Sequence, residues 1–377
     1  MDRQRRQIRL FKIVGSTTVG LLGHLELFDI EAAPPYRALS YTWGDSAPIY
    51  LIVINEQTCT IRSNLSRFLK VYGARHFDEY IWIDQLCIDQ SNNMERNHQV
   101  LLMPEIYQGA AEVLIWLGPG KHHFQSYHGM EDSCCDLNCT EQHFRSDKCK
   151  WMIVLVQNDY WQRMWIVQEV LLARSLKIYC GRTILNWAEM REYILHNDRF
   201  NTPLQFWYLD KLVREGFCHS KFDLADAIRH CSKSGCQDPR DKVYALQGLL
   251  PENSRLQIDY NKQISMIFFE AVAGLLCHGY ARYPHLYERQ GRQNSFSWLV
   301  NWVPPMLKLK DVLDAIWHLA CEMGFRAVAE KRGINLGLKF NKLWPLIKAY
   351  DDAPSMSSMR IRCFESLLNE IENQFKE

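Results

Sequence analysis

Three short runs along the chain are apolar at nearly every position instead of alternating with polar residues. They are Ala38–Tyr41, Tyr80–Ile83 and Val113–Leu117. Such runs are typical of strands covered on both faces, as in a parallel sheet between helices. Upstream, Ile8–Val14 and Leu21–Phe28 mix apolar and polar residues on either side of a Gly/Ser/Thr turn, which predicts a hairpin or two edge strands.

The segments between the apolar runs have helical spacing. Asn64–Tyr72 places its large apolar residues on one helical face. Asn92, followed three residues later by Glu95, predicts a capping box at the start of a second helix. Pro104 lies inside that helix and should kink or restart it. Strand and helix thus alternate, which predicts an α/β layer architecture.

The rest of the chain divides into a polar stretch and a mainly helical region. Residues 118–150 are polar, rich in His and Cys and without period, and we interpret them as a variable surface insertion. Trp151–Gln157 and Tyr160–Ala173 are predicted to be helices, and Ile178–Cys180 a short strand. Further helices are expected at Phe222–His230, from Asp238 with Pro239 in its first turn, and at Gln263–His278, Leu309–Cys321 and Met359–Phe375. We therefore expect N-terminal strands (1–35), an α/β domain (36–185) and a mainly helical C-terminal region (186–377).

Composition narrows the class of protein. The 377 residues are 47% hydrophobic and 23% charged, as in a folded protein, and the net charge of +1 gives no reason to expect a nucleic-acid partner. No apolar stretch approaches the length that spans a bilayer or forms a signal peptide. The 13 cysteines follow no regular disulfide framework, which predicts reduced thiols. These features favour a soluble cytoplasmic protein.

Polar residues follow each of the three apolar runs. Trp43 and Asp45 follow the first, Asp84 and Asp89 the second, and a Gly-Pro-Gly turn (118–120) the third. If the strands are parallel, these loops converge at one edge of the sheet, where ligands bind in such folds. A tryptophan and carboxylates there suit a polar ligand with a flat ring. The alternative is that the aspartates only cap turns and helices.

Glu169 lies in a segment that is apolar around nearly its whole circumference. A buried carboxylate there is unfavourable unless it pairs with a cation or has a functional role. Trp165 precedes it by four residues, so the indole can shield the carboxylate and raise its pKa by desolvation. The alternative is a buried ion pair with Arg37 or Arg163 that holds the helix in place.

A cluster in the insertion has ligands suited to zinc: Cys135, Cys139, His143 and Cys149. Its spacing matches no common zinc module, and free surface thiols are the alternative. Signatures of hydrolase triads, P-loops, zinc proteases and dinucleotide-binding folds are absent from the sequence.

Four blocks, taken in order, resemble the fungal heterokaryon-incompatibility (HET) domain family. They are Tyr36–Asp45, Ile81–Gln90, the helix and strand from Glu95 to Gly118, and Arg163–Glu169. Weaker likeness extends downstream through Asp238–Leu246 and Ser297–Pro304 and fades over the last ~70 residues. Asp89 stands where the family often has Asn, and Pro104 and the Cys/His insertion are peculiar to this chain.

The resemblance implies a role in self/non-self recognition that triggers programmed cell death. The HET family is similar in turn to Toll/interleukin-1 receptor (TIR) domains, which implies a TIR/flavodoxin-like parallel sheet flanked by helices. Trp165-x-x-x-Glu169 is similar to the motif whose glutamate is catalytic in NAD-cleaving TIR domains. By this likeness Glu169 would be catalytic, Trp43 or Trp165 would stack on a ring, and Asp84 would bind ribose. NAD would be a substrate, and no cofactor or metal would be needed.

Three hypotheses follow. The chain is an NAD-cleaving cell-death protein that uses Glu169, or a non-catalytic signalling module in which Glu169 is structural, or a zinc-supported regulator. Self-association or binding to another incompatibility protein is expected in the first two.

Overall fold

The computed structural model describes residues 5–18, 20–119, 155, 157–196, 202–252 and 255–264, together with residues 267, 271, 318, 319, 322 and 323. The chain divides into two compact units, Met1–Phe217 and Cys218–Glu377. Each is described by itself below.

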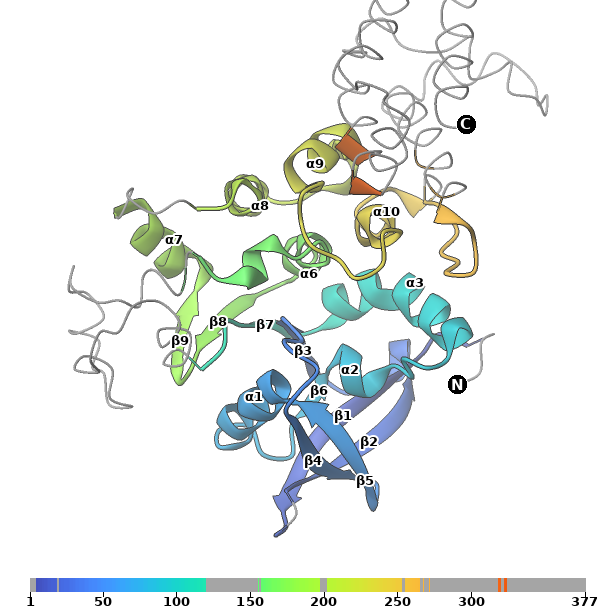
Figure 1. Cartoon of the computed structure of the whole chain (residues 1–377). Helices are drawn as coiled ribbons and strands as arrows, with labels where there is room; N and C mark the ends of the chain where they lie inside the picture. The colour runs from blue at the N-terminus through green and yellow to red at the C-terminus, as the bar shows by residue number, and fades with distance from the viewer. Residues whose placement is uncertain are drawn as a thin grey trace, which may run out of the picture. The chain divides into compact units, whose positions relative to one another are not determined.

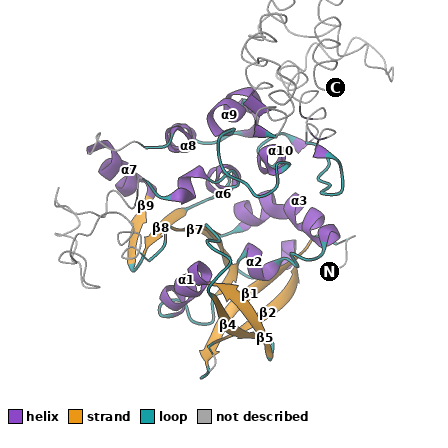
Figure 2. Cartoon of the chain, viewed as in Figure 1, coloured by secondary structure: helices purple, strands orange, loops and turns teal. Residues whose placement is uncertain are grey.

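The first unit is built on one mixed sheet (Figures 1 and 2). Its strands are β1 (Gln7–Ser16), β2 (Leu21–Asp29), β3 (Tyr36–Tyr41), β4 (Ile49–Ile54), β5 (Gln57–Arg62), β6 (Tyr80–Trp82), β7 (Glu112–Trp116), β8 (Leu176–Cys180) and β9 (Thr183–Asn186). Among the described residues their order is β5-β4-β2-β1-β6-β3-β7-β8-β9. The α/β class expected from the alternation of elements is confirmed.

The three apolar runs form adjacent parallel strands at the centre of the sheet. β3 pairs in parallel with β6 on one side and with β7 on the other. β8 continues the parallel set beyond β7. The carboxyl ends of these strands therefore lie at one edge, as the sequence predicts.

Further strands extend this parallel centre on both sides, in antiparallel pairs except for β2 and β4, which pair in parallel. The predicted β1–β2 hairpin is confirmed, and β1 pairs antiparallel with β6. Two further elements were not predicted, the β4–β5 hairpin and the terminal strand β9. The β4–β5 turn uses Asn55 and Glu56 at positive φ (49° and 66°). Glu56 there departs from the Asn-Gly and Asp-Gly pairs by which such turns are recognised in a sequence.

Helices cover both faces of the parallel centre. On one face, Phe68 of α1 (Ser63–Gly73) packs against Trp116 of β7 and Tyr179 of β8. On the other, Tyr107 of α3 (Asn93–Gly109) meets Trp82 of β6 edge to face, with ring centroids 5.5 Å apart. The large aromatic side chains of the core are thus divided between two layers, which explains why the strands are apolar on both faces.

The capping prediction for α3 is correct in part. The Asn92 side chain accepts hydrogen bonds from the backbone N–H groups of Met94 and Glu95. Glu95 does not complete a capping box; its carboxylate instead accepts the backbone N–H of Asp89 and pairs with Arg9 of β1. The helix continues through Pro104, which is buried.

The helix predicted over Tyr160–Ala173 is wrong as one element. A 3₁₀ turn (η3, Asp159–Gln162) is followed by an extended residue, Arg163 (φ −81°, ψ 137°), and then by α6 (Ile166–Leu171). Asn158 caps the turn by accepting the N–H of Tyr160. The break lets the Arg163 side chain reach Glu169, which a continuous helix would place nearly two turns away. Two more helices complete this unit: α7 (Trp187–His196) and α8 (Leu204–Glu215).

The remaining short elements are α2 (Asp84–Cys87) and η1 (Ile30–Ala32) in the first unit and η4 (His219–Lys221) in the second. Helix α9 (Leu224–Cys231) confirms the helix predicted there, with Asp223 as its cap. Helix α10 spans Asp241–Gln247 and begins later than predicted from Asp238 and Pro239. The Asp238 carboxylate is held instead by the backbone and guanidinium of Arg240.

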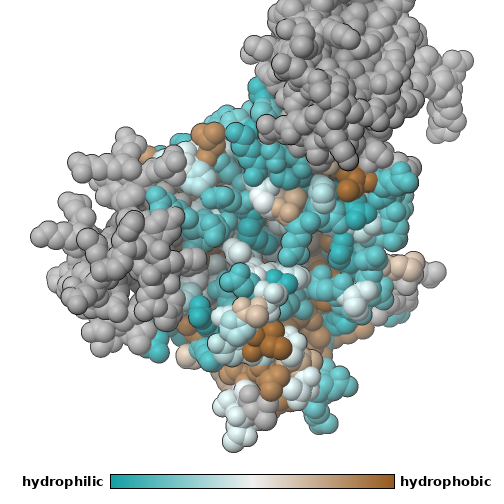
Figure 3. All heavy atoms as spheres, in the orientation of Figure 1, coloured by the Kyte–Doolittle hydropathy of each residue, from teal (hydrophilic) through white to brown (hydrophobic). Residues whose placement is uncertain are grey.

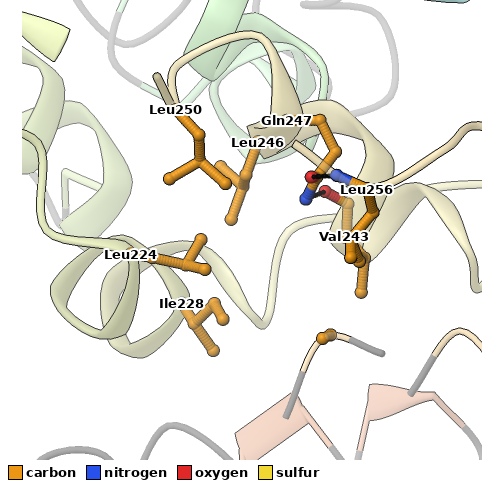
Figure 4. A pocket seen from close by; sticks show the side chains of 8 residues that line it. Leu224, Ile228, Val243, Leu246, Gln247, Leu250 and Leu256 are labelled. Atoms are coloured by element: carbon orange, nitrogen blue, oxygen red, sulfur yellow. Dashed lines mark hydrogen bonds between the residues drawn. The ribbon is translucent and has the colours of Figure 1, made fainter. Parts of the chain in front are cut away.

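An apolar hollow lies between α9 and α10 (Figure 4). Leu224 and Ile228 of α9 face Val243 and Leu246 of α10 across it, and Gln247 closes one side by accepting the backbone N–H of Leu256. Beside it, the buried Lys242 ammonium donates to the carbonyls of Ser232 and Ser234 at 2.5 and 2.6 Å. These contacts give the Asp238–Leu246 segment a structural role in the second unit.

Several predicted elements lie outside the described residues: the 118–150 insertion beyond Pro119, most of Trp151–Gln157, most of Gln263–His278, most of Leu309–Cys321, and all of Met359–Phe375. Within the part of the chain that is described, no helix is both long enough and apolar enough to span a bilayer.

Candidate functional site

Glu169 lies on α6 against the middle of β3 and is 2% exposed. The hydroxyl of Ser40, a buried residue of β3, donates a hydrogen bond to the Glu169 carboxylate. The Tyr160 hydroxyl lies 2.6 Å from the same Ser40 oxygen. A serine has one proton to donate. Ser40 therefore donates to Glu169 and accepts from Tyr160, so the three side chains form a directed chain of hydrogen bonds.

Arg163 is the cation nearest to this carboxylate, with its Nη1 3.5 Å from Glu169 Oε2. The Nη1 atom is buried and makes no hydrogen bond among the described residues. Gln205 of α8 fixes the backbone at this point by donating to the Arg163 carbonyl at 2.8 Å. The other arginine considered, Arg37, pairs elsewhere, with Glu79 and Glu112. The geometry thus agrees with the buried ion pair weighed above, with Arg163 as partner.

Burial dominates the electrostatics of this cluster. It raises the pKa of Glu169, although the Arg163 guanidinium and the Ser40 hydrogen bond act in the opposite direction. Burial also raises the pKa of Tyr160, and the Glu169 charge raises it further. The pKa of Arg163, which burial would lower, is raised on balance by the carboxylates of Glu169 and Asp84. Glu169 therefore binds a proton more readily than a carboxylate in water.

Asp84 and Trp43 form a second pair at the carboxyl ends of β6 and β3. The indole N–H of Trp43 donates to Asp84 Oδ2 at 2.8 Å, and the backbone N–H of Gln85 donates to Oδ1 at 2.7 Å. Burial raises the pKa of Asp84, while Arg163 and these donors oppose the shift. The Arg62 guanidinium lies 5.1 Å from the centroid of the Trp43 ring. Arg163 thus interacts with the carboxylates of both Asp84 and Glu169.

The other predicted site residues have local roles or exposed positions. Asp45 is exposed in the loop after β3. Asp89 is also exposed, and its carboxylate accepts the backbone N–H of Ser91 at 3.0 Å and the hydroxyl at 2.6 Å, which lowers the Asp89 pKa. Trp165 is half-buried just before α6, and its carbonyl accepts the backbone N–H of Glu169. The geometry of Asp89 is that of a turn-capping residue.

Three members of the cluster were not predicted as site residues: Ser40, Tyr107 and Tyr160. The hydroxyl of Tyr107 of α3 donates to the Leu39 carbonyl at 3.3 Å, and Tyr107 also opposes the rise in the Glu169 pKa. A serine in an otherwise apolar strand was the available signal for Ser40, because a buried hydroxyl requires a partner. The two tyrosines carry no such signal, because their rings fit a core on hydrophobic grounds alone.

Cys135, Cys139, His143 and Cys149 lie outside the described residues. Within the described ranges, no group of three or more His, Cys, Asp or Glu side chains could hold a metal ion.

The arrangement is a buried carboxylate with a high proton affinity, held between a serine hydroxyl and a guanidinium. If ionised, such a carboxylate can stabilise a developing positive charge strongly, because few water molecules screen it. In the conformation described, Glu169 accepts a hydrogen bond from Ser40 and pairs with Arg163, so it also holds α6 against β3. The same geometry therefore suits either chemistry or structure.

Comparison with known proteins gives a consistent result. Residues 36–169 match the sequence profile of the family "Heterokaryon incompatibility protein (HET)". The chain is 24% identical over 364 residues to "Heterokaryon incompatibility protein 6, OR allele" of Neurospora crassa, with 73% of this chain and 54% of that protein covered. It is 21% identical over 220 residues to "Vegetative incompatibility protein HET-E-1" of Podospora anserina, covering 57% of this chain and 14% of that protein. The chain thus spans about half of the first relative and a small part of the second. No solved structure matches.

Proposed function

Because the chain belongs to the HET family through residues 36–169, we propose that it acts in heterokaryon incompatibility, as a fungal protein that triggers cell death on non-self recognition. The names of the two relatives support this role. We also propose a cytoplasmic location, which the lack of a regular disulfide framework in the sequence supports.

The first candidate mechanism is cleavage of NAD at Glu169. The position of this carboxylate supports it: Glu169 of α6 meets Ser40 in the parallel centre of the sheet, and the charge of Arg163 acts on both Glu169 and Asp84, which Trp43 binds at the strand ends. In such a reaction the bond between nicotinamide and ribose breaks, nicotinamide leaves, and water attacks the positively charged ribose carbon. Ionised Glu169 would stabilise that charge. Trp43 and Trp165 would contact the rings, and Asp84 would bind ribose.

The second candidate is a non-catalytic signalling domain in which Glu169 is structural. The observation that favours it is the 2% exposure of Glu169 together with its hydrogen bond from Ser40 and its ion pair with Arg163. For NAD to reach Glu169, some of the groups that cover this carboxylate must move, because it is almost completely buried. A non-catalytic domain needs no such movement, so the described conformation favours this second candidate.

Viability and cellular NAD in a fungal host after induced expression separate the two candidates. The variant Glu169→Gln keeps an acceptor for Ser40 but cannot stabilise a cation. If Glu169 cleaves NAD, wild type must reduce both viability and cellular NAD, and Glu169→Gln must reduce neither. A structural Glu169 requires both proteins to kill with NAD unchanged. Glu112→Gln, which changes a carboxylate paired with Arg37 and Lys177 away from the cluster, is the control.

The incompatibility role itself has a separate test. If neither wild type nor any variant reduces viability or blocks colony fusion, while the protein is present and folded, the proposed role is wrong for this chain.

A further inference from the structure

The hairpin β4–β5 ends the sheet on one side. Among the described residues, β5 has β4 as its one neighbour. Apolar side chains gather on the surface in this region (Figure 3). On β4, Ile49 is 59% exposed and Leu51 is 48% exposed. The opposite face of the hairpin is covered, with Ile52 and Ile61 at 0% and 2% exposure.

The register of the hairpin determines which backbone groups of β5 face outward. The two-residue turn at Asn55 and Glu56 makes Ile54 and Gln57 a hydrogen-bonded closing pair. Hydrogen-bonded and non-hydrogen-bonded pairs alternate along an antiparallel ladder. Cys59 and Ile61 therefore bond to β4, whereas Thr58 and Thr60 direct their N–H and C=O groups away from it. Arg62 contributes only its N–H to this outward edge, because its C=O accepts the first hydrogen bond of α1.

This outward edge carries little of the usual protection against pairing, because its one charged residue, Arg62, lies at the end of the strand. Natural edge strands are blunted by Lys, Pro, bulges or short length. β5 has six residues in unbroken register with β4, and Gln57–Arg62 contains neither Pro nor Lys. The strand at the other end of the sheet, β9, has four residues. Thr58 and Thr60 are also β-branched, which favours a strand partner.

We propose that a second copy of this chain pairs antiparallel with β5, so that the two sheets become continuous across a two-fold axis. The outward groups fix the register, because only Thr58, Thr60 and Arg62 can bond. Thr60 must face Thr60 of the other copy, and Thr58 must face Arg62. This gives about four backbone hydrogen bonds between the copies, two between the Thr60 residues and one in each Thr58–Arg62 pair.

The outward edge argues for a second copy rather than an unrelated strand because it is self-complementary. A two-fold axis brings identical residues together, and the central outward residue, Thr60, is uncharged and small enough to face itself. On either side, the cation of Arg62 meets the neutral Thr58, so no like charges oppose one another. The exposed apolar side chains of β4 in the two copies also lie on the same face of the continuous sheet. Each β4 is the strand next to the β5–β5 contact.

Cysteine crosslinking of the full chain tests this register with a matched pair of variants. Both are made in a Cys59→Ser background: Thr60→Cys and Thr58→Cys. In the proposed dimer the two Cα atoms at position 60 are about 5.5 Å apart, within the range of a disulfide. Those at position 58 are about 14 Å apart. We expect mild oxidation to link Thr60→Cys between chains and to leave Thr58→Cys unlinked.

Sedimentation of the unmodified chain gives an independent readout. Wild type is expected to show a concentration-dependent dimer at micromolar concentrations. Thr60→Pro removes an N–H that does not bond to β4, so the hairpin is retained while the dimer weakens by at least about tenfold. Circular dichroism checks that the variant remains folded. A wild-type chain that is monomeric throughout, crosslinking at position 58 instead of 60, or a dimer unaffected by Thr60→Pro would each overturn the proposal.

Discussion

At the scale of single residues, opposing effects set the pKa of Glu169. Removal from water disfavours its charge, while Arg163 and the Ser40 hydroxyl favour it, and burial prevails in raising the pKa. A group whose pKa is higher in the folded than in the unfolded chain contributes stability below its unfolded pKa. That contribution is lost as the pH rises through the folded pKa.

The variant Glu169→Gln should therefore change how stability depends on pH. Gln cannot lose a proton, so the stability that wild type loses above about pH 4.5, its unfolded pKa, is retained in the variant. We expect the free energy of unfolding of Glu169→Gln, relative to wild type, to rise from this pH toward neutrality. Denaturant titrations at several pH values measure it. A variant that becomes relatively less stable over this range would mean that the Arg163 ion pair outweighs burial.

Ser40→Ala should be destabilising through two partners at once. It leaves the Tyr160 hydroxyl without its acceptor and Glu169 without a donor, which costs about 1–3 kcal/mol. It also raises the Glu169 pKa further, because the lost hydrogen bond had lowered it. Ser66→Ala, in α1 and also buried, is the control. Two results together would contradict this prediction. Ser40→Ala and Ser66→Ala would lose equal free energy of unfolding, and the loss for Ser40→Ala would be the same in a Glu169→Gln background. The hydrogen-bond chain would then not be what stabilises the cluster.

At the scale of elements, the β1–β2 hairpin depends on a glycine that sequence patterns do not explain. A Cβ on Gly23 would lie 2.1 Å from the ring of Phe11, which is completely buried. Gly15, on the partner strand, would have its nearest neighbour at 3.7 Å. We expect Gly23→Ala to lower the free energy of unfolding by about 1–3 kcal/mol, because the ring must move within a packed core.

Gly15→Ala is the matched control, and thermal unfolding of both variants measures the difference. A loss of stability for Gly23→Ala no larger than for Gly15→Ala would show that the Phe11 ring adjusts without strain.

The elements that the sequence predicts well are those with a repeated pattern over several residues. The three apolar runs and the helices α1 and α3 have such patterns, and the parallel pairing follows from them. The break at Arg163 could not be predicted in this way, because the surrounding residues are apolar enough for one continuous helix. It depends on the cap at Asn158 and on Gln205, which is distant in sequence. The β4–β5 turn also depends on positive φ angles at Asn55 and Glu56, and Glu56 is not a residue type that predicts such a conformation.

The candidate site was predictable to a similar degree. Glu169 was identified because a lone carboxylate in an apolar segment requires an explanation, and Arg163 was one of the two arginines expected near it. Trp43 and Asp84 do contact one another at the strand ends. Ser40, which donates to Glu169, and Tyr160 and Tyr107 beside it come from a strand, a 3₁₀ turn and a helix, so their meeting depends on tertiary packing.

At the scale of the whole molecule, the first compact unit extends beyond the residues that match the family. Helices α7 and α8 follow Glu169 in sequence, yet they cover the turn that positions it. Phe206 of α8 packs against Trp161 of η3 with ring centroids 5.1 Å apart and stacks on Trp187 of α7 at 5.6 Å. Gln205 holds the Arg163 backbone from the same helix. The Glu169 cluster thus requires residues up to about the end of this unit at Phe217.

Truncation tests this dependence. Residues 1–217 expressed alone should unfold cooperatively and keep the near-ultraviolet circular dichroism of packed tryptophans. Residues 1–186 lack both helices, and Trp161, which is completely buried in the full chain, would lose the rings that cover it. Exposing this surface and releasing Arg163 removes several kcal/mol of burial and hydrogen bonding from a domain of marginal stability, so we expect residues 1–186 to lose cooperative unfolding. Equal melting temperatures for the two fragments would instead mean that the cluster is assembled by residues before 187 alone.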